Sequence, residues 1–328
     1  MQKQYKRITD EERDKIADLL AKGHSQNSIA EKLQRSPSSI SRELSRNSRV
    51  VNGYGAVYAS RLSHRRRASC RKGKSKLSGN DRLNEYVTNK LNKLWSPEEI
   101  AKRIKMDYPQ DKNMRISSEA IYQYLYIQPS KELRRLLRHG HLRRHKQGRP
   151  KKSDNRGKIP NMTMIDERPE EVVSRLVPGH WEGDIIKGKY NKSALGTLVE
   201  RRTRYTILVP LPGFDSESVR KAFARALTDL PEHMRRTLTY DQGKEMSDHI
   251  EFTISTDIQV YFAHEGSPWE RGTNENTNGL IRQFFPKGTD FTKVTNEQVD
   301  HAQALLNDRP RKVLGYLKPN EVLSKVLR

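Results

Sequence analysis

Cysteine and long apolar runs are the two features that this 328-residue sequence has least of. It contains one cysteine, Cys70, so no disulfide can form within the chain and a reducing compartment is expected. A single cysteine also excludes a zinc ribbon or a zinc module of two cysteines and two histidines. No apolar run approaches the length of a membrane span, and the first residues lack the apolar segment of a signal peptide. We therefore expect a cytoplasmic protein with no membrane partner.

Acidic residues are scarce in the first half of the chain. Residues 1–160 carry 39 Lys and Arg against 16 Asp and Glu, whereas residues 161–328 carry 24 of each. The whole net charge of +23 therefore lies in the first half. This distribution predicts one half that binds a polyanion such as DNA and a second, neutral globular half.

Residues 9–47 predict three short helices. Thr9 or Asp10 caps the first, and Ser36 followed by Pro37 opens the third after a tight turn. This order is typical of a helix-turn-helix domain, in which the last helix reads DNA bases. A small helical bundle with a solvated basic face is the alternative. The candidate DNA-binding residues of the third helix are Ser38, Ser39, Arg42 and Arg46.

Two further stretches of the first half are strongly basic. Residues 61–76 hold eight basic residues and no acid, which predicts a flexible linker that contacts phosphates, or a solvated loop. Residues 131–160 include a Gly-Arg-Pro segment that can lie in a minor groove, although a linker explains it equally well. Between them, residues 81–126 predict a second helical module resembling a helix-turn-helix. The DNA-binding candidates of the two basic stretches are Arg65, Arg66, Arg67 and Arg149.

From about residue 172 the pattern becomes that of a mixed α/β domain. HWEGDII (180–186) reads as a strand, and ALGTLVE (194–200) with YTILVPL (205–211) reads as a hairpin. LTYD (238–241) and QVYFA (259–263) are short buried strands with helices between and after them. Strands alternating with helices predict a mixed sheet covered by helices.

Three carboxylates of this half are the candidate catalytic and metal-binding residues: Asp184, Asp241 and Glu275. Both aspartates lie at or near strand ends among apolar neighbours, where a charge is costly unless it is paired or bound to a metal. Glu275 lies in TNENTNGLIRQFFPKG (273–288), on the same helical stripe as Arg271, Asn278 and Arg282. Glu182 competes with Asp184 for the metal, and Glu245 and Asp248 compete with Asp241.

An oxygen-only cluster of this kind suits Mg²⁺ or Mn²⁺. Two such ions can activate a water or a 3′-hydroxyl and stabilise the leaving oxygen at a phosphodiester, with Arg282 holding a DNA phosphate. A Ser/His/Asp hydrolase is less attractive because no nucleophile elbow lies near a histidine.

These stretches resemble DDE transposases of the insertion-sequence-thirty family, within the retroviral integrase and RNase H-like superfamily. The matching segments are SPSSISREL (36–44), LWSPEEIAKRI (94–104), HWEGDII (180–186), TLVERRTRYTIL (197–208), LTYDQGKEM (238–246), SPWERGTNENTNGLIRQFFPKGTDF (267–291) and LNDRPRKVLGYLKPNEVL (306–323). The 33 residues between Asp241 and Glu275 are the spacing that the resemblance implies. Some relatives carry an additional helix-turn-helix before the one seen here.

The resemblance implies a multi-domain protein with an all-α helix-turn-helix half and an RNase H-like, integrase-type catalytic domain. It implies Asp184, Asp241 and Glu275 as the metal triad and Arg282 as the basic residue after it. It further implies a bacterial, nucleoid-associated homo-oligomer that acts on terminal inverted repeats and target DNA. The alternatives are a DNA-binding regulator with an inert oligomerisation domain and a nuclease without strand transfer. The expected boundaries are a helix-turn-helix domain (1–50), a basic linker (51–80), a second helical module (81–145), a basic linker (146–171) and the catalytic domain (172–328).

Overall fold

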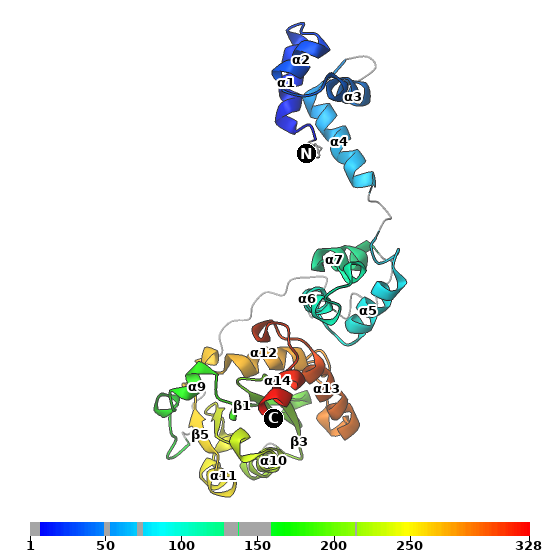
Figure 1. Cartoon of the computed structure of the whole chain (residues 1–328). Helices are drawn as coiled ribbons and strands as arrows, with labels where there is room; N and C mark the ends of the chain where they lie inside the picture. The colour runs from blue at the N-terminus through cyan, green and yellow to red at the C-terminus, as the bar shows by residue number, and fades with distance from the viewer. Residues whose placement is uncertain (1–6, 49–52, 71–74, 128–136, 138–158, 214) are drawn as a thin grey trace. The chain divides into compact units, whose positions relative to one another are not determined.

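The computed structural model describes residues 7–48, 53–70, 75–127, 137, 159–213 and 215–328. The chain divides into two compact units, Met1–Gly79 and Asn80–Arg328. Each unit is described by itself below (Figure 1). Within the described residues, no helix is long and apolar enough to span a membrane.

The first unit begins with the three helices that the sequence predicts. These are α1 (Asp10–Ala21), α2 (Gln26–Lys32) and α3 (Pro37–Asn47). Thr9 caps α1 in a capping box with Glu12, because the Thr9 side chain accepts a bond from the Glu12 backbone and the Glu12 side chain accepts one in return. Ile16, Ile29 and Ile40 are fully buried, one from each helix, and form the small core.

A fourth helix, α4 (Ala56–Cys70), replaces most of the flexible linker that the basic residues suggested. The linker prediction is wrong for these residues because α4 packs against α1 and α3. The buried Arg13 of α1 donates hydrogen bonds to Glu43 of α3 at 2.7 Å and to Ser63 of α4 at 3.1 Å. Lys and Arg residues are good helix formers, so a run of them does not by itself indicate a linker.

The second unit starts with a helical module of α5 (Asp81–Asn92), α6 (Pro97–Asp107) and α7 (Ser118–Ile127), with a 3₁₀ turn η1 (Lys112–Met114) before α7. Ser96 and Glu99 form the capping box of α6. Leu83, Ile100 and Ile121 are fully buried, one from each helix. Residues 146–158 of the basic linker predicted over residues 146–171, with Arg149, lie outside the described residues, and the described remainder holds the 3₁₀ turn η2 (Ile165–Glu167).

A five-stranded mixed sheet forms the centre of the rest of this unit, in the order β3-β2-β1-β4-β5. β1 pairs antiparallel with β2 and parallel with β4, β2 pairs antiparallel with β3, and β4 pairs parallel with β5. The strands are β1 (His180–Lys187), β2 (Ala194–Glu200), β3 (Thr206–Leu211), β4 (Thr237–Tyr240) and β5 (Gln259–Phe262). The predicted strands and the mixed character of the sheet are confirmed.

Helices cover both faces of the sheet (Figure 1). α10 (Ser216–Thr228) and α11 (His249–Thr256) bury Phe223 and Phe252 on one face. α12 (Gly272–Ile281) and α13 (Asn296–Asp308) bury Ile281 and Leu306 on the other. The remaining elements are η2 (Ile165–Glu167), α9 (Glu171–Ser174), η3 (Lys189–Asn191), η4 (Glu232–Met234), η5 (Lys244–Met246), η6 (Pro268–Arg271), η7 (Phe291–Lys293), η8 (Lys312–Leu314) and α14 (Pro319–Val326).

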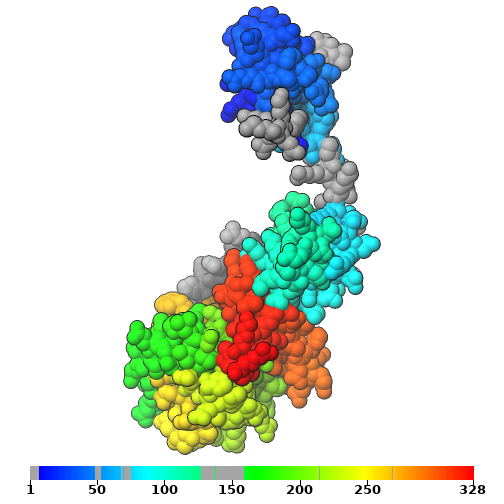
Figure 2. Space-filling view, in the orientation of Figure 1, coloured from blue at the N-terminus to red at the C-terminus, as the bar shows by residue number. Residues whose placement is uncertain are grey.

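The C-terminal segment after α13 packs onto the α5–α7 module, as the red and teal surfaces in Figure 2 show. Arg103 of α6 donates a 2.7 Å hydrogen bond to Glu321 of α14. Buried Arg309 donates to Glu99 at 2.9 Å. The sequence suggested separate modules over residues 81–145 and 172–328, whereas these contacts join the described part of the helical module to the sheet domain in one compact unit.

Candidate active site

The register of the sheet places Asp184 beside Asp241. In the parallel pair of β1 and β4, Glu182 lies opposite Thr239. Continuing this register by two residues brings Asp184 level with Asp241, and both carboxylates lie beside the same arginine, Arg271. β4 ends at Tyr240, so Asp241 is the first residue after that strand. Asp184 is not at the end of its own strand, because β1 continues to Lys187, but it lies just beyond the part of β1 that pairs with β4.

Helix α12 runs along β1 and brings polar side chains to this point. Asn274 donates to the Glu182 carbonyl at 3.1 Å, and Asn278 donates to Asp184 Oδ2 at 2.7 Å. Residues four apart on α12 contact residues two apart on β1 because four helix residues advance about 6 Å, close to the ~6.6 Å of two strand residues. Arg271 and Asn278 of the predicted stripe therefore contact β1, and the Asn278 amide holds the Asp184 carboxylate in one orientation.

Arg271, immediately before α12, lies between the two aspartates. Its guanidinium donates to Asp241 Oδ2 at 3.0 Å and to the Gly183 carbonyl at 3.1 Å, and it lies 3.7 Å from Asp184 Oδ1. Burial raises the pKa of Asp184, the charge of Arg271 opposes this shift, and the charge of Asp241 adds to it. Two carboxylates thus converge on one cation in a partly desolvated position. The sequence pattern placed Arg271 on the same helical stripe as Glu275 but did not predict its contact with the aspartates.

Glu275 lies on the same stripe, between Arg271 and Asn278. It follows Arg271 by four residues and precedes Asn278 by three, so these side chains are its neighbours on the helix surface. Its own side chain is exposed. Among the residues that the structure describes, no three His, Cys, Asp or Glu side chains form a group that could hold a metal ion. The structure therefore brings together Asp184 and Asp241, whereas the exposed Glu275 does not form a group with them.

The two aspartates fit a hard divalent cation. Their oxygens already share a cationic partner, Arg271, and carboxylate oxygens are ligands that Mg²⁺ and Mn²⁺ prefer.

Glu182, the alternative to Asp184, has a different environment. It is fully buried and accepts hydrogen bonds from Arg201 at 2.9 Å and from the Asn274 backbone at 2.9 Å. Both of its oxygens are occupied, so it fixes the start of α12 against β1. Asp248 directly precedes α11. Glu245 lies in η5, with its carboxyl beside Gly243.

Arg282 ends α12 and lies at the far end of β1. Its guanidinium donates to the backbone carbonyls of Lys187 at 3.1 Å and of Phe285 and Pro286 at 3.4 Å. In this conformation the arginine joins the end of α12 to the end of β1. Its donors do not reach the aspartates.

The DNA-binding candidates of the first unit fall into two groups. Ser38, Arg42 and Arg46 are exposed on one helix, α3, as predicted, and Ser39 is half-buried. Arg65 and Arg67 are exposed on α4, whereas Arg66 donates to the Arg46 carbonyl and so caps the end of α3.

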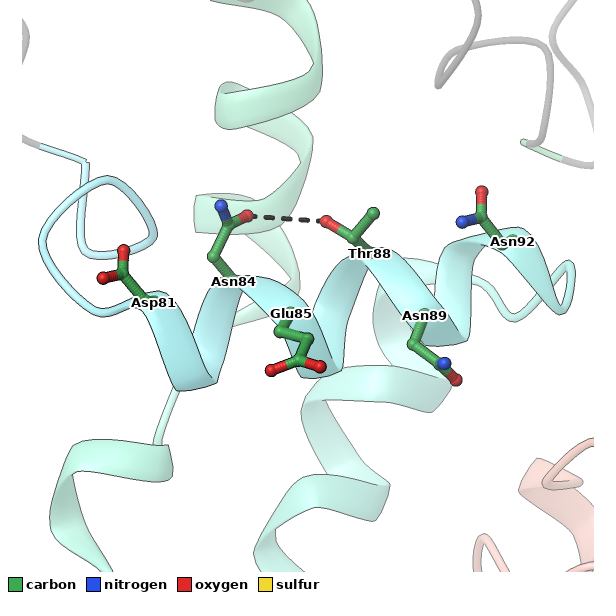
Figure 3. Close-up of a pocket in the computed structure, with 6 residues that line it drawn as sticks. All are labelled: Asp81, Asn84, Glu85, Thr88, Asn89 and Asn92. Atoms are coloured by element: carbon green, nitrogen blue, oxygen red, sulfur yellow. Dashed lines mark hydrogen bonds between the residues drawn. The ribbon is translucent and has the colours of Figure 1, made fainter.

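Two hollows of the second unit lie away from the carboxylates. One, of ≈ 420 Å³, runs along α5 and is lined by acids, amides and a threonine, with Thr88 bonded to Asn84 (Figure 3). The other, of ≈ 1090 Å³, lies beside β3 between α10 and α13. Neither is lined by Asp184, Asp241 or Glu275.

Comparisons with known proteins were made on sequence and on structure. A family model described as a helix-turn-helix domain matches residues 4–47, and one described as an integrase core domain matches residues 175–268. The transposase for insertion sequence element IS1086 of Cupriavidus metallidurans is 42% identical over 98% of this chain and 96% of that protein. Transposase InsI for element IS30A of Escherichia coli is 43% identical over 97% of this chain and 83% of that protein.

More distant similarities were also found. The transposase for element IS4351 of Bacteroides fragilis is 36% identical over 98% of this chain and 97% of that protein. Among solved structures, the simian T-cell lymphotropic virus intasome in complex with PP2A regulatory subunit B56 gamma matches with a TM-score of 0.34 and 18% identity, over 40% of this chain and 49% of that one.

Proposed function

Because the chain belongs to the IS30 family of insertion-sequence transposases, we propose that it binds the terminal inverted repeats of its element and cuts and joins DNA there. The observation that carries this proposal is the convergence of Asp184 and Asp241 on one cationic position, with Asn278 orienting one of them. A metal-dependent phosphodiester reaction needs such a pair of carboxylates beside an open surface.

In this proposal Asp184, Asp241 and Glu275 hold two divalent ions. The ions supply activation of the attacking hydroxyl and stabilisation of the leaving oxygen at phosphorus. Asn278 holds the Asp184 carboxylate in one orientation through its 2.7 Å hydrogen bond. The buried bonds of Glu182 to Arg201 and to the Asn274 backbone fix α12, the helix that carries Glu275, on β1.

DNA binding is assigned to the exposed face of α3 in the first unit. Ser38, Arg42 and Arg46 project from this helix, which follows the turn of the helix-turn-helix. The net charge of the first half adds attraction to any DNA sequence, while the small side chains and the arginines of α3 are suited to reading base edges. A homo-oligomer that holds two element ends follows from the family and is part of the proposal.

The test is cutting and joining of a plasmid that carries the native element ends, with Mg²⁺, by wild-type protein and by Glu275→Gln. Glu245→Gln is the matched control, because Glu245 is a nearby acid outside the proposed triad. We expect the wild type and Glu245→Gln to cut and join, and Glu275→Gln to bind the ends equally well without reacting. Equal activity of Glu275→Gln would remove Glu275 from the site. Binding by the wild type without any reaction favours the regulator instead.

A further inference from the structure

Four arginines gather beside the candidate active site, on the α12 face of the sheet. Arg201 and Arg204 come from the turn between β2 and β3, and Arg168 and Arg175 come from the segment before β1. We call Arg168, Arg175, Arg201 and Arg204 the arginine cluster. Its centre is the buried carboxylate of Glu182, which pairs with Arg201 at 2.9 Å.

The carboxylates near the cluster have their oxygens bound elsewhere. The second carboxylate oxygen of Glu182 accepts a hydrogen bond from the Asn274 backbone N–H. Glu200 is fully buried and accepts from the backbone N–H groups of Gly179 and Thr203. Glu270 accepts from the backbone N–H of His264 and lies 3.0 Å from its ring. Only one arginine of the cluster therefore has a direct ion-pair partner among the described residues.

The donors of the cluster exceed the acceptors around them. Arg168 donates to Thr239 Oγ1 at 3.1 Å, and Arg204 donates to Thr273 Oγ1. The Nε atoms of Arg168, Arg201 and Arg204 are buried and have no hydrogen-bond partner within the described part of the chain. Arg175 is exposed and makes no hydrogen bond or ion pair within the described residues. Buried donors without an acceptor are costly, so a set of them in one place is suited to binding an anion.

The arginines also repel one another. Burial lowers the pKa of Arg201 to about 10, Glu182 opposes the shift, and Arg168, Arg175 and Arg204 deepen it. Burial lowers the pKa of Arg204 as well, and the charge of Arg175 is the next cause. An anion bound among these side chains relieves both the desolvation and the repulsion.

The position of the cluster suggests which anion this is. Glu182 precedes Asp184 by two residues on the same face of β1, about 6.6 Å along a strand. Thr273, which accepts from Arg204, precedes Glu275 by two residues on α12. The cluster is therefore about two nucleotide steps from the aspartates, at ~3.4 Å of axis rise per step. A DNA strand whose reacting phosphodiester lies at the aspartates passes close to the cluster.

We propose that the arginine cluster is a phosphate-binding site that holds the DNA backbone one or two nucleotides from the reacting phosphodiester. Planar guanidinium groups match phosphate oxygens in pairs, which explains why the cluster is made of arginine and not of lysine. The proposal rests on the proposed function, since it takes DNA as the ligand of this domain. It adds a second contact that fixes the strand beside the carboxylates.

The test uses the full-length protein and a precut element-end duplex in EDTA, so that no metal-dependent step takes part. DNA affinity is measured by fluorescence anisotropy over a range of salt concentrations for wild type, Arg168→Gln/Arg175→Gln and Arg202→Gln. Arg175→Gln is measured as well, and Arg202→Gln is its matched control, because Arg202 is also exposed, lies in the turn that carries Arg201 and Arg204, and loses one positive charge. We expect the double variant to bind about ten-fold more weakly, as for loss of charged hydrogen bonds. The slope of log K against log salt falls by about 0.9 for each lost phosphate contact.

A single neutral methylphosphonate is then moved along the terminal nucleotides of the duplex. At one position it weakens binding by the wild type and by Arg202→Gln, and has no further effect on the double variant. If no position shows this coupling, or if Arg202→Gln weakens binding as much as Arg175→Gln, the phosphate site is wrong. Melting curves check the fold of the double variant. If it is unfolded, Arg175→Gln alone carries the same test, because Arg175 is exposed and unbonded. Loss of cutting activity with the coupling intact would count against the proposed chemistry and not against this site.

Discussion

Arg271 is expected to compete with divalent ions for the two aspartates when no DNA is bound. Its guanidinium lies 3.0 Å from Asp241 and 3.7 Å from Asp184, so an ion that takes both carboxylates must displace it. A hydrogen bond to a charged group contributes roughly 1.5–3 kcal/mol, and part of this is regained when the arginine is rehydrated. We take about 1.4 kcal/mol as the net cost, which corresponds to a ten-fold change in affinity. Arg271→Gln is therefore expected to bind Mn²⁺ about ten-fold more tightly.

The assay is isothermal titration of the DNA-free protein with Mn²⁺ at pH 8. A basic pH is needed because Arg271 opposes the raised pKa of Asp184, so its removal raises that pKa further and increases competition from protons at lower pH. Arg282→Gln is the control, since it removes an equal charge near the end of α12 from a side chain that contacts only backbone carbonyls. Weaker Mn²⁺ binding by Arg271→Gln, or equal tightening by Arg282→Gln, would refute the reasoning.

Other predictions follow from single contacts. Asp184→Asn should raise the free energy of unfolding by about 1 kcal/mol near pH 7, because it removes a partly buried charge. Thermal melts should show this gain vanishing as the pH falls through the raised pKa of Asp184, because the wild-type carboxyl is then protonated and neutral as well. Burial lowers the pKa of His180 to about 4, so the histidine stays neutral in the folded state while it takes up a proton in the unfolded state. The free energy of unfolding should therefore fall by on the order of 3 kcal/mol between pH 6.5 and 4. Loss of this pH dependence in His180→Asn would show that His180 causes it. A double-mutant cycle of Arg103→Ala and Glu321→Ala should give a coupling energy of about 1 kcal/mol, and no coupling would mean that α14 does not hold α6. Arg42→Ala should lower discrimination between element ends and random DNA in binding assays, and unchanged discrimination would remove it from base reading.

Periodicity and capping signals predicted most of the elements because they are local. Ser36 before Pro37 begins α3, and the apolar residues on either side of Asp184 form β1, as expected. The helix α4 was missed because its basic residues give it almost no amphipathic pattern. Its stability comes from contacts with α1 and α3, such as the one between Arg13 and Ser63. Such tertiary contacts leave no trace in local composition.

The pairing of Asp184 with Asp241 was predictable from the sequence, but the contacts of Arg271 and Asn278 with these aspartates were not. Asp184 and Asp241 each follow or interrupt an apolar strand, and parallel strands bring such residues to one edge of a sheet. Arg271 and Asn278 were visible only as members of a helical stripe. The contacts that give them roles depend on the register of α12 on β1, which Glu182 fixes through its buried bond to the Asn274 backbone. A sequence pattern does not contain that register.

The central claim is that Asp184, Asp241 and Glu275 form one metal site on this sheet. The most direct measurement is anomalous scattering from Mn²⁺ in crystals of the protein bound to precut element-end DNA. We predict two peaks between the three carboxylates, with oxygen ligands from all of them, and the Arg271 guanidinium moved away from Asp184 and Asp241. Mn²⁺ bound at the two aspartates with Glu275 still directed to solvent would contradict the account, and so would an absence of Mn²⁺ from the aspartates.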